Sequence, residues 1–282
     1  MQKINFGDIP EKYAKYEKAK FVVVGVPYDG TSTWGKGADK GPAAIIDASC
    51  NMELYDIETD TEPYTKGIFT DTPVTEKSSP EKMVSAVQKK IADHIKNKKV
   101  TVLLGGEHSV SIGAIQAHAK NSKQKISVLQ LDAHTDMRDA YLGSKNNHAC
   151  AMARAKDVAN VIQVGIRSMD TGEKKNIDFK KVFFAKDIVG KKDWIKKVLP
   201  LLTDKVYITI DLDAFDPSIV PSTGTPEPGG LGWYETLDAL REVCKKKKII
   251  GFDVVELAPN KIDRASDFVA ARLIYHLMAW IR

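Results

Sequence analysis

Cysteine is scarce in this 282-residue sequence, which excludes a fold held together by disulfides. The cysteines are Cys50, Cys150 and Cys244, an odd number at unrelated spacings. Small secreted proteins instead carry an even set of closely spaced cysteines. We therefore expect a protein of the reducing cytoplasm.

A hydrophobic run long enough to cross a membrane is also missing. The longest apolar segment, residues 268–281, is interrupted by Arg272 and His276, and it falls short of the roughly 20 residues that a membrane helix needs. Residues 1–20 are polar and hold no apolar core of a signal peptide. These features predict a cytoplasmic protein with no membrane partner.

Basic residues are in slight excess, but they lack the pattern of a nucleic-acid-binding protein. The formal net charge is +5, and the lysines form scattered clusters, such as residues 191–192 and 245–248, among acidic residues. No aromatic residues interleave with these lysines and no recognisable binding module is present. We expect solvated helix faces and no nucleic-acid partner.

What the sequence does contain is a long alternation of apolar strands and helical segments. With 43% hydrophobic residues the chain can build one sizeable α/β domain over residues 1–282. The alternation predicts a doubly wound, mostly parallel sheet. Strands are expected at residues 21–26, near 68, 100–104, 126–131, 161–164, 182–184, 206–213 and 249–255. Helices are expected at residues 43–48, 79–94, after 109, after 150, 194–202 and 266–281. The helix at 79–94 should carry an apolar stripe of Met83, Val84, Val87 and Ile91, Ser109 should cap the helix that follows it, and the last helix should be amphipathic.

Polar side chains follow several of the predicted strands. His108, Asp132, Asp211 and Glu256 each come at the carboxyl end of a different strand. Ligands of parallel sheets bind outside this edge, so we expect these side chains to meet in one site. The remaining helical histidines are expected to be structural or exposed: His94, His118 and His276.

Two short motifs add metal-capable side chains at the same edge. Alternate residues of an extended chain share one side, so Asp132, His134 and Asp136 converge if their strand continues, whereas a loop leaves their geometry open. Asp211 and Asp213 are likewise two residues apart. This much carboxylate does not suit a structural zinc and fits two divalent ions such as Mn²⁺, which would activate water for hydrolysis. The candidate ligands are His108, Asp132, His134, Asp136, Asp211 and Asp213.

A glycine-rich loop follows the first predicted strand. Residues 30–37 (Gly-Thr-Ser-Thr-Trp-Gly-Lys-Gly) nearly match a phosphate-binding G-x-x-x-x-G-K-[ST] loop. Gly37 stands where a magnesium-binding hydroxyl is required, and Gly41 and Pro42 interrupt the helix that should begin there. The loop can equally form the rim of a pocket.

Together these motifs resemble those of the ureohydrolases, the family of arginases, agmatinases and their relatives. The matching segments are Gly-Gly-Glu-His-Ser at 105–109, Asp-Ala-His-Thr-Asp at 132–136, Asp-Leu-Asp-Ala-Phe-Asp-Pro at 211–217 and Thr-Gly-Thr-Pro-Glu-Pro-Gly-Gly at 223–230. They occur in the family's order, and the resemblance runs from about Gly25 to Glu256. It implies a three-layer αβα sandwich of the arginase/deacetylase type, two Mn²⁺ per chain and a homo-oligomer, either a trimer or a hexamer.

Carried over by position, the resemblance also implies a role for each site residue. Asp132 and Asp211 would bridge the two ions, with His108 and Asp136 completing one site and His134 and Asp213 the other. Hydroxide held between the ions, and hydrogen-bonded to Asp136, would attack the guanidinium carbon of the substrate. The residues expected to bind the guanidinium, to steady that contact and to shuttle a proton to the leaving amine are, in order, Glu256, Thr225 and His148, the last followed by Ala149 in place of the family's Gly.

The sequence does not decide which small cationic guanidino compound is the substrate. Arginases typically carry Asn two residues after the last aspartate of Asp-x-His-x-Asp, where it helps hold the α-carboxylate, but this chain has Arg138. That is similar to the agmatinase branch, which implies hydrolysis of agmatine to putrescine and urea in polyamine biosynthesis. Arg138 could also bind a carboxylate tail. The alternatives are 4-guanidinobutyrate, N1-aminopropylagmatine and arginine.

Two other classes of protein stay open. A single-zinc deacylase shares this fold and part of the Asp-x-His pattern, but would leave the second set of ligands unused. A nucleotide-binding module rests on residues 30–37 alone. Counting the metal bound per chain tests the first class, and ATP retention tests the second.

Overall fold

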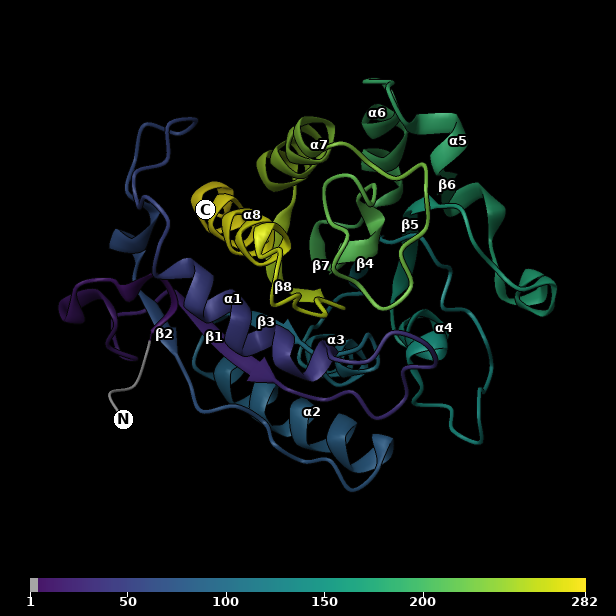
Figure 1. Cartoon of the computed structure of the whole chain (residues 1–282), viewed down its shortest axis with the longest axis horizontal. Helices are drawn as coiled ribbons and strands as arrows, with labels where there is room; N and C mark the ends of the chain where they lie inside the picture. The colour runs from purple at the N-terminus through teal and green to yellow at the C-terminus, as the bar shows by residue number, and fades with distance from the viewer. Residues whose placement is uncertain (1–4) are drawn as a thin grey trace.

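The strands form one eight-stranded sheet, which the computed structural model describes with its flanking helices over residues 5–282 (Figure 1). The strand order is β2-β1-β3-β8-β7-β4-β5-β6, and each neighbouring pair runs parallel. The predicted α/β fold with a parallel sheet is confirmed. The strands are β1 (Phe21–Val26), β2 (Ile68–Thr70), β3 (Val100–Gly105), β4 (Ser127–Leu131), β5 (Asn160–Ile166), β6 (Val182–Phe184), β7 (Lys205–Asp211) and β8 (Lys248–Val255).

Helices cover both faces of the sheet, because its strands are apolar on both sides. All residues of β1 are buried, as expected for a strand between two helical layers. Helices α1, α5, α6, α7 and α8 pack into the core on one face, and α2, α3 and α4 into the core on the other (Figure 1). The helices are α1 (Gly41–Ser49), α2 (Pro80–Lys96), α3 (Val110–Lys120), α4 (Ala151–Lys156), α5 (Ala185–Ile188), α6 (Trp194–Val198), α7 (Trp233–Lys246) and α8 (Ala265–Trp280).

The long helix α2 begins where the sequence predicts. The Ser79 hydroxyl accepts a hydrogen bond from the Lys82 backbone N–H at 3.2 Å, and Pro80 opens the helix. Proline suits this position because the first N–H groups of a helix have no partner within it. The predicted apolar stripe is buried against α3 and the sheet, and its residues are Met83, Val84, Val87 and Ile91.

Three local predictions need correction, and one helix was not predicted. The predicted helix at 194–202 ends at Val198 and tightens into a 3-10 turn, because Pro200 has no N–H to donate. Ser109 does not cap α3, since its hydroxyl donates to Glu107 instead. Helix α8 is buried along most of its length and is not amphipathic. Helix α7 stands where the sequence analysis names no helix.

The helical histidines have structural roles, as predicted. His94 lies 3.0 Å from the Asp71 carboxylate, and His118 lies 2.8 Å from the Thr101 hydroxyl. His276 pairs with a buried aspartate on the segment after α1. Within residues 5–282 no helix is long and apolar enough to cross a membrane. The predictions about residues 1–20 fall partly outside the described residues, and the single domain over residues 1–282 stays a prediction.

Candidate active site

Four neighbouring strands bring the predicted polar residues to one edge of the sheet. β3, β8, β7 and β4 lie side by side, and their carboxyl ends lead into His108, Glu256, Asp211 and Asp132 respectively. Parallel strands end at the same edge. The coincidence seen in the sequence is therefore a real convergence in space.

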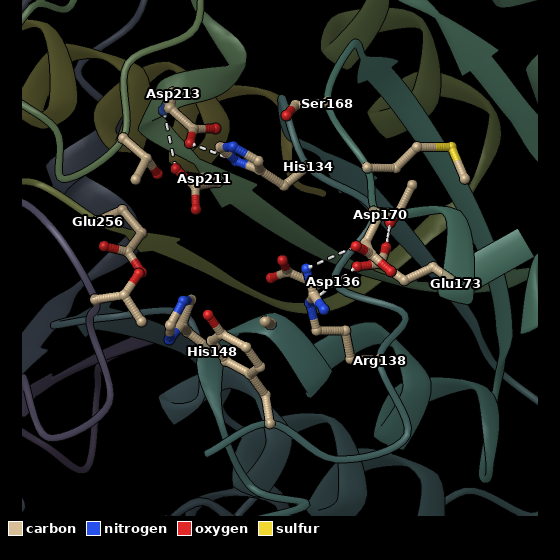
Figure 2. A pocket seen from close by; sticks show the side chains of 16 residues that line it. His134, Asp136, Arg138, His148, Ser168, Asp170, Glu173, Asp211, Asp213 and Glu256 are labelled. Carbon is tan, nitrogen blue, oxygen red and sulfur yellow. Dashed lines mark hydrogen bonds and ion pairs between the residues drawn. The ribbon is translucent and has the colours of Figure 1, made fainter.

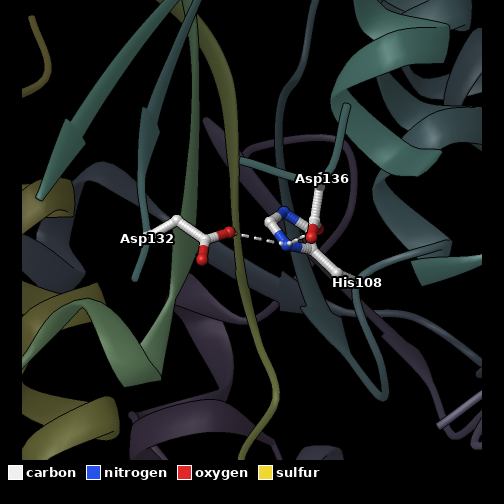
Figure 3. A group of neighbouring side chains, drawn as sticks. All are labelled: His108, Asp132 and Asp136. Atoms are coloured by element: carbon white, nitrogen blue, oxygen red, sulfur yellow. Dashed lines mark ion pairs between the residues drawn. The ribbon is translucent and has the colours of Figure 1, made fainter. Parts of the chain in front are cut away.

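A first group of metal-capable side chains surrounds the Nδ1 atom of His108 (Figure 3). This atom lies 3.1 Å from Asp132 Oδ2, 3.1 Å from Asp136 Oδ2 and 3.4 Å from Asp211 Oδ2. It is buried and makes no hydrogen bond among the described residues. A buried imidazole nitrogen aimed at three carboxylates, with no hydrogen-bond partner, fits a metal ligand.

A second group is built on His134. Its Nδ1 atom lies 2.9 Å from Asp213 Oδ2 and 3.7 Å from Asp132 Oδ1. Asp132, His134 and Asp213 can hold one ion, and Asp132 also belongs to the first group. The structure thus places Asp132 between two metal-binding groups, with Asp211 beside the first. A buried His/Asp cluster of this kind is consistent with a binuclear metal site.

The convergence after β4 arises from a turn and not from an extended strand. β4 ends at Leu131, and Asp136 adopts a left-handed backbone conformation with φ of 52°. The Asp136 carbonyl accepts backbone hydrogen bonds from Met152 (3.0 Å) and Ala153 (3.1 Å) at the start of α4. These bonds hold a conformation that non-glycine residues rarely adopt.

The predicted strand at 206–213 is likewise too long. β7 ends at Asp211, and a 3-10 turn begins at Leu212. The Asp211 carboxylate accepts the Asp213 backbone N–H at 2.9 Å, and the Asp213 carboxylate accepts the Ala133 N–H at 3.0 Å. Aspartate favours such turns because its short side chain can bond the backbone two residues on. A turn therefore brings the two carboxylates together, and they do not lie on one face of an extended strand.

The cluster buries several carboxylates close together, and their negative charges repel one another. Burial, and then the charge of Asp132, raise the pKa of Asp136 to about 6. Burial, followed by Asp213 and Asp132, raises the pKa of Asp211 well above its ordinary value. Burial opposes a charge on His134, but the nearby carboxylates raise its pKa to about 12. A divalent cation would compensate this charge, so the donor set fits a metal.

A buried network behind the cluster orients His108. Its Nε2 atom lies 2.9 Å from the Thr209 hydroxyl, which donates to the Asp253 carboxylate at 2.6 Å. The Tyr207 hydroxyl donates to the other Asp253 oxygen at 2.7 Å. Metal-binding histidines commonly fix their second ring nitrogen in this way. Sequence analysis missed Thr209, because within an apolar strand it looks like an ordinary β-branched residue.

Arg167, the first residue after β5, clamps the turn that carries Asp213. Its guanidinium donates to the Asp213 carbonyl at 2.6 Å and to the Glu227 carbonyl at 2.7 Å. It therefore ties the turn that holds a metal-ligand candidate to the proline-rich loop at 223–230. Arginine suits this position because the five N–H groups of its guanidinium can donate to several carbonyls at once.

A pocket of about 320 Å³ opens over the cluster (Figure 2). His148 and Glu256 lie on one side of it, and Arg138, Asp170 and Glu173 on the other (Figure 2). Thr225 also lines this pocket, as does Thr33 of the glycine-rich loop. That loop is thus part of a pocket rim, the second of the two interpretations of residues 30–37.

Glu256 enters the pocket from a left-handed backbone conformation with φ of 65°. Its Oε1 atom accepts the His108 backbone N–H at 2.8 Å. Burial, and next the charge of Glu107, raise the Glu256 pKa well above its ordinary value. Arg264, the first arginine after Glu256 in the sequence, pairs with Asp47 (2.8 Å) and Asp267 (2.9 Å) and not with this carboxylate. Glu256 is therefore left as an acceptor for a cation that enters the pocket.

The far side of the pocket carries an ion-pair group that sequence analysis only half identified. Arg138 Nε lies 3.3 Å from Glu173 Oε1, and its NH2 group lies 3.6 Å from Asp170 Oδ2. The guanidinium also sits over the Tyr141 ring, 4.7 Å from its centroid. Asp170 and Glu173 follow β5, so their position after a predicted strand was the feature of the sequence that could have identified them as site residues.

The parallel αβα sandwich and the buried His/Asp cluster at its carboxyl edge together define the arginase-like class of α/β proteins. The chain belongs to the Arginase family, whose sequence profile matches residues 19–280, and is thus a ureohydrolase of that family. An N(1)-aminopropylagmatine ureohydrolase of Synechocystis sp. is 38% identical, over 96% of this chain and 92% of its own. An agmatinase of Pyrococcus horikoshii is 31% identical, over 92% of this chain and 91% of its own. The crystal structure of an agmatine ureohydrolase of Thermoplasma volcanium superposes with a TM-score of 0.88 at 30% identity, covering 99% of this chain and 94% of that one.

Proposed function

We propose that this ureohydrolase binds two Mn²⁺ ions and hydrolyses a guanidino compound with a cationic tail, N1-aminopropylagmatine before agmatine. The arrangement of the pocket carries the proposal. Two metal-binding groups lie beside it, with Glu256 on one side and an acidic group on the other (Figure 2). A substrate with a guanidinium at one end and ammonium groups at the other matches this layout.

The metal-binding part of the proposal follows the sequence assignment. Asp132 and Asp211 would be shared by both ions, with His108 and Asp136 on one side and His134 and Asp213 on the other. Such an oxygen-rich set with some imidazole suits manganese. When bound, the ions supply Lewis acidity that lowers the pKa of water and makes it nucleophilic near neutral pH.

The side chains of the pocket would then bind the substrate and handle protons. Glu256 would accept guanidinium N–H groups and so hold the central carbon in place. Asp136 would accept a hydrogen bond from the attacking water. His148 would carry a proton to the leaving nitrogen, because burial lowers its pKa to about 4 and keeps the ring neutral. One C–O bond forms, the C–N bond to the alkyl amine breaks, and both water protons end on that amine.

The charge of the far side favours a cationic tail over a carboxylate tail. Arg138 already pairs with Asp170 and Glu173, so its guanidinium is not free for a substrate carboxylate. The Asp170 side chain is 45% exposed and that of Glu173 only 5%. Asp170 is therefore the carboxylate that an incoming ammonium would meet. This supports polyamine-type substrates over arginine and 4-guanidinobutyrate.

The order of the two favoured substrates reverses the one drawn from the sequence, which ranked agmatine first. The curated relative at 38% identity is named for N1-aminopropylagmatine, and the agmatinase shares 31%. N1-aminopropylagmatine also carries one more ammonium than agmatine, and the acidic group around Asp170 can accommodate it. Agmatine remains the second substrate of the proposal.

A substrate panel with matched metal analysis tests the proposed function. Urea release would be measured with Mn²⁺ present for N1-aminopropylagmatine, agmatine, 4-guanidinobutyrate and arginine. We expect kcat/KM to favour the two cationic-tail compounds over arginine by more than ~10²-fold, since a carboxylate without a partner must be desolvated. Metal analysis should give two ions per chain, and chelation should abolish turnover. No urea from any guanidine in metal-loaded protein would refute the proposal, and a single ion would favour the deacylase alternative.

A further inference from the structure

Glu107 is a fully buried carboxylate beside the pocket that the proposed reaction does not use. Its Oε1 atom accepts hydrogen bonds from the Thr31 hydroxyl (2.8 Å), the Thr31 backbone N–H (3.2 Å) and the Ser109 hydroxyl (2.9 Å). Its Oε2 atom accepts the Ser109 backbone N–H at 2.7 Å. A ring of donors matches an ionised, acceptor-only carboxylate.

Thr31 connects this carboxylate to His148. A threonine hydroxyl has one hydrogen to donate and two lone pairs to accept with. The hydrogen of the Thr31 hydroxyl goes to Glu107, and one lone pair accepts the His148 backbone N–H at 3.0 Å. The remaining lone pair faces His148 Nδ1 at 3.1 Å. Since the hydroxyl has no second hydrogen, the proton of this last contact must belong to Nδ1.

We infer that Glu107 and Thr31 are positioning residues that fix His148 as the Nδ1–H tautomer, with the lone pair of Nε2 presented to the pocket. The inference rests on the proposed function, in which His148 transfers a proton. A neutral imidazole can accept a proton only at its unprotonated nitrogen. Thr31 therefore leaves Nε2 as the nitrogen that can accept a proton. The hydrogen bond from the His148 backbone N–H to Thr31 also fixes the position of the backbone from which the imidazole projects.

The opposite arrangement is disfavoured by the surroundings of Glu107. If the Thr31 hydroxyl donated to His148 Nδ1 instead, the fully buried Glu107 Oε1 would lose a donor. A buried charged acceptor without its partner is strongly destabilising. The Tyr141 ring also packs edge-on against the imidazole, with centroids 6.2 Å apart. The ring thus has a defined orientation as well as a defined tautomer.

The tautomer can be read directly by solid-state ¹⁵N NMR of histidine-labelled full-length protein, prepared with diamagnetic Mg²⁺ in place of Mn²⁺. Signals of His148 are identified by their loss in His148→Gln. Three variants are compared with the wild type. Thr31→Val removes the hydroxyl and keeps the shape, Thr31→Ser keeps the hydroxyl, and Ser109→Ala removes a different donor from the same carboxylate.

We expect His148 of the wild type to carry its proton on Nδ1. Thr31→Val should shift the population toward the Nε2–H form, whereas Thr31→Ser and Ser109→Ala should retain Nδ1–H. A wild-type ring protonated on Nε2 would overturn the inference, and so would a Thr31→Val ring indistinguishable from that of Thr31→Ser. The wild-type and Thr31→Ser spectra decide the matter even if Thr31→Val does not fold.

Kinetics add a second readout. Thr31→Val should lower kcat by about 10- to 100-fold, less than the loss of the whole imidazole, with KM changed by less than about threefold. Thr31→Ser should recover most of kcat. Failure of the proposed function would appear as no urea from any guanidine, while the tautomer result would stand independently. A normal tautomer response with an unchanged kcat would show that the positioning has no catalytic role.

Discussion

Replacing Glu256 by glutamine is the sharpest test of how the pocket holds a guanidinium. The His108 backbone N–H donates to Glu256 Oε1 at 2.8 Å, and in Glu256→Gln that N–H still requires an oxygen acceptor. The new amide must therefore turn its NH₂ group toward the pocket. There it would meet the N–H groups of the guanidinium, so a donor faces donors where an acceptor stood.

The size of the effect follows from the bonds that are lost. Each charge-assisted hydrogen bond contributes about 1.5–3 kcal/mol, and a bidentate contact has two of them. A loss of roughly 3–6 kcal/mol corresponds to a fall in kcat/KM of about 10²- to 10⁴-fold. The metal ligands are untouched, so the metal content of Glu256→Gln should equal that of the wild type.

The assay is urea release from agmatine and N1-aminopropylagmatine, with bound metal measured on the same samples. Asp170→Asn is the matched control, because it neutralises a carboxylate on the opposite side of the same pocket (Figure 2). It should raise KM several-fold with little change in kcat, since an exposed ion pair contributes only about 1 kcal/mol. Metal-loaded Glu256→Gln within tenfold of the wild type would refute the reasoning.

Three further expectations concern the metals, the proton carrier and stability. Asp132→Asn should lose both ions and activity, because Asp132 belongs to both metal-binding groups, and one ion retained would show that Asp132 does not bridge. His148→Ala should keep both ions and lower kcat by roughly 10²-fold, whereas a lost ion would make His148 a ligand. Burial lowers the pKa of His118 to about 3, so on acidification from pH 6.5 toward 3 the unfolded chain binds a proton that the folded chain does not. The free energy of unfolding should fall over that window by up to about 1.4 kcal/mol per pH unit. Denaturant unfolding at several pH values measures this slope, which should be smaller in His118→Gln. An equal slope in both proteins would contradict the prediction.

The sheet was predictable because buried parallel strands leave a simple mark in the sequence. Runs such as residues 21–26 are apolar at every position, and each of the eight strands lies within a few residues of its expected place. The polar residues after four of these runs were therefore placed at one edge. Helix α7 was missed, although its buried Leu237, Leu240 and Val243 recur at helical spacing.

The turns that shape the site were not predictable, because distant parts of the chain hold them. Asp136 keeps its left-handed backbone through bonds from the start of α4, and the turn at Asp213 is clamped by Arg167. A spacing of two residues suggested a common strand face at both places. The correct side chains converge, but they do so through contacts between segments that the local sequence does not encode.

One irregularity of the sheet explains why the network behind His108 could not be foreseen. β7 and β8 pair as Val206 with Ile249, but as Tyr207 with Gly251, so β8 gains one residue at that point. Without this bulge Thr209 would face the apolar Phe252, whereas beyond it Thr209 faces Asp253 and can donate to its carboxylate. Bulges near functional sites re-aim side chains in this way. The register of two strands, more than any motif, thus connects a buried carboxylate to a candidate metal ligand.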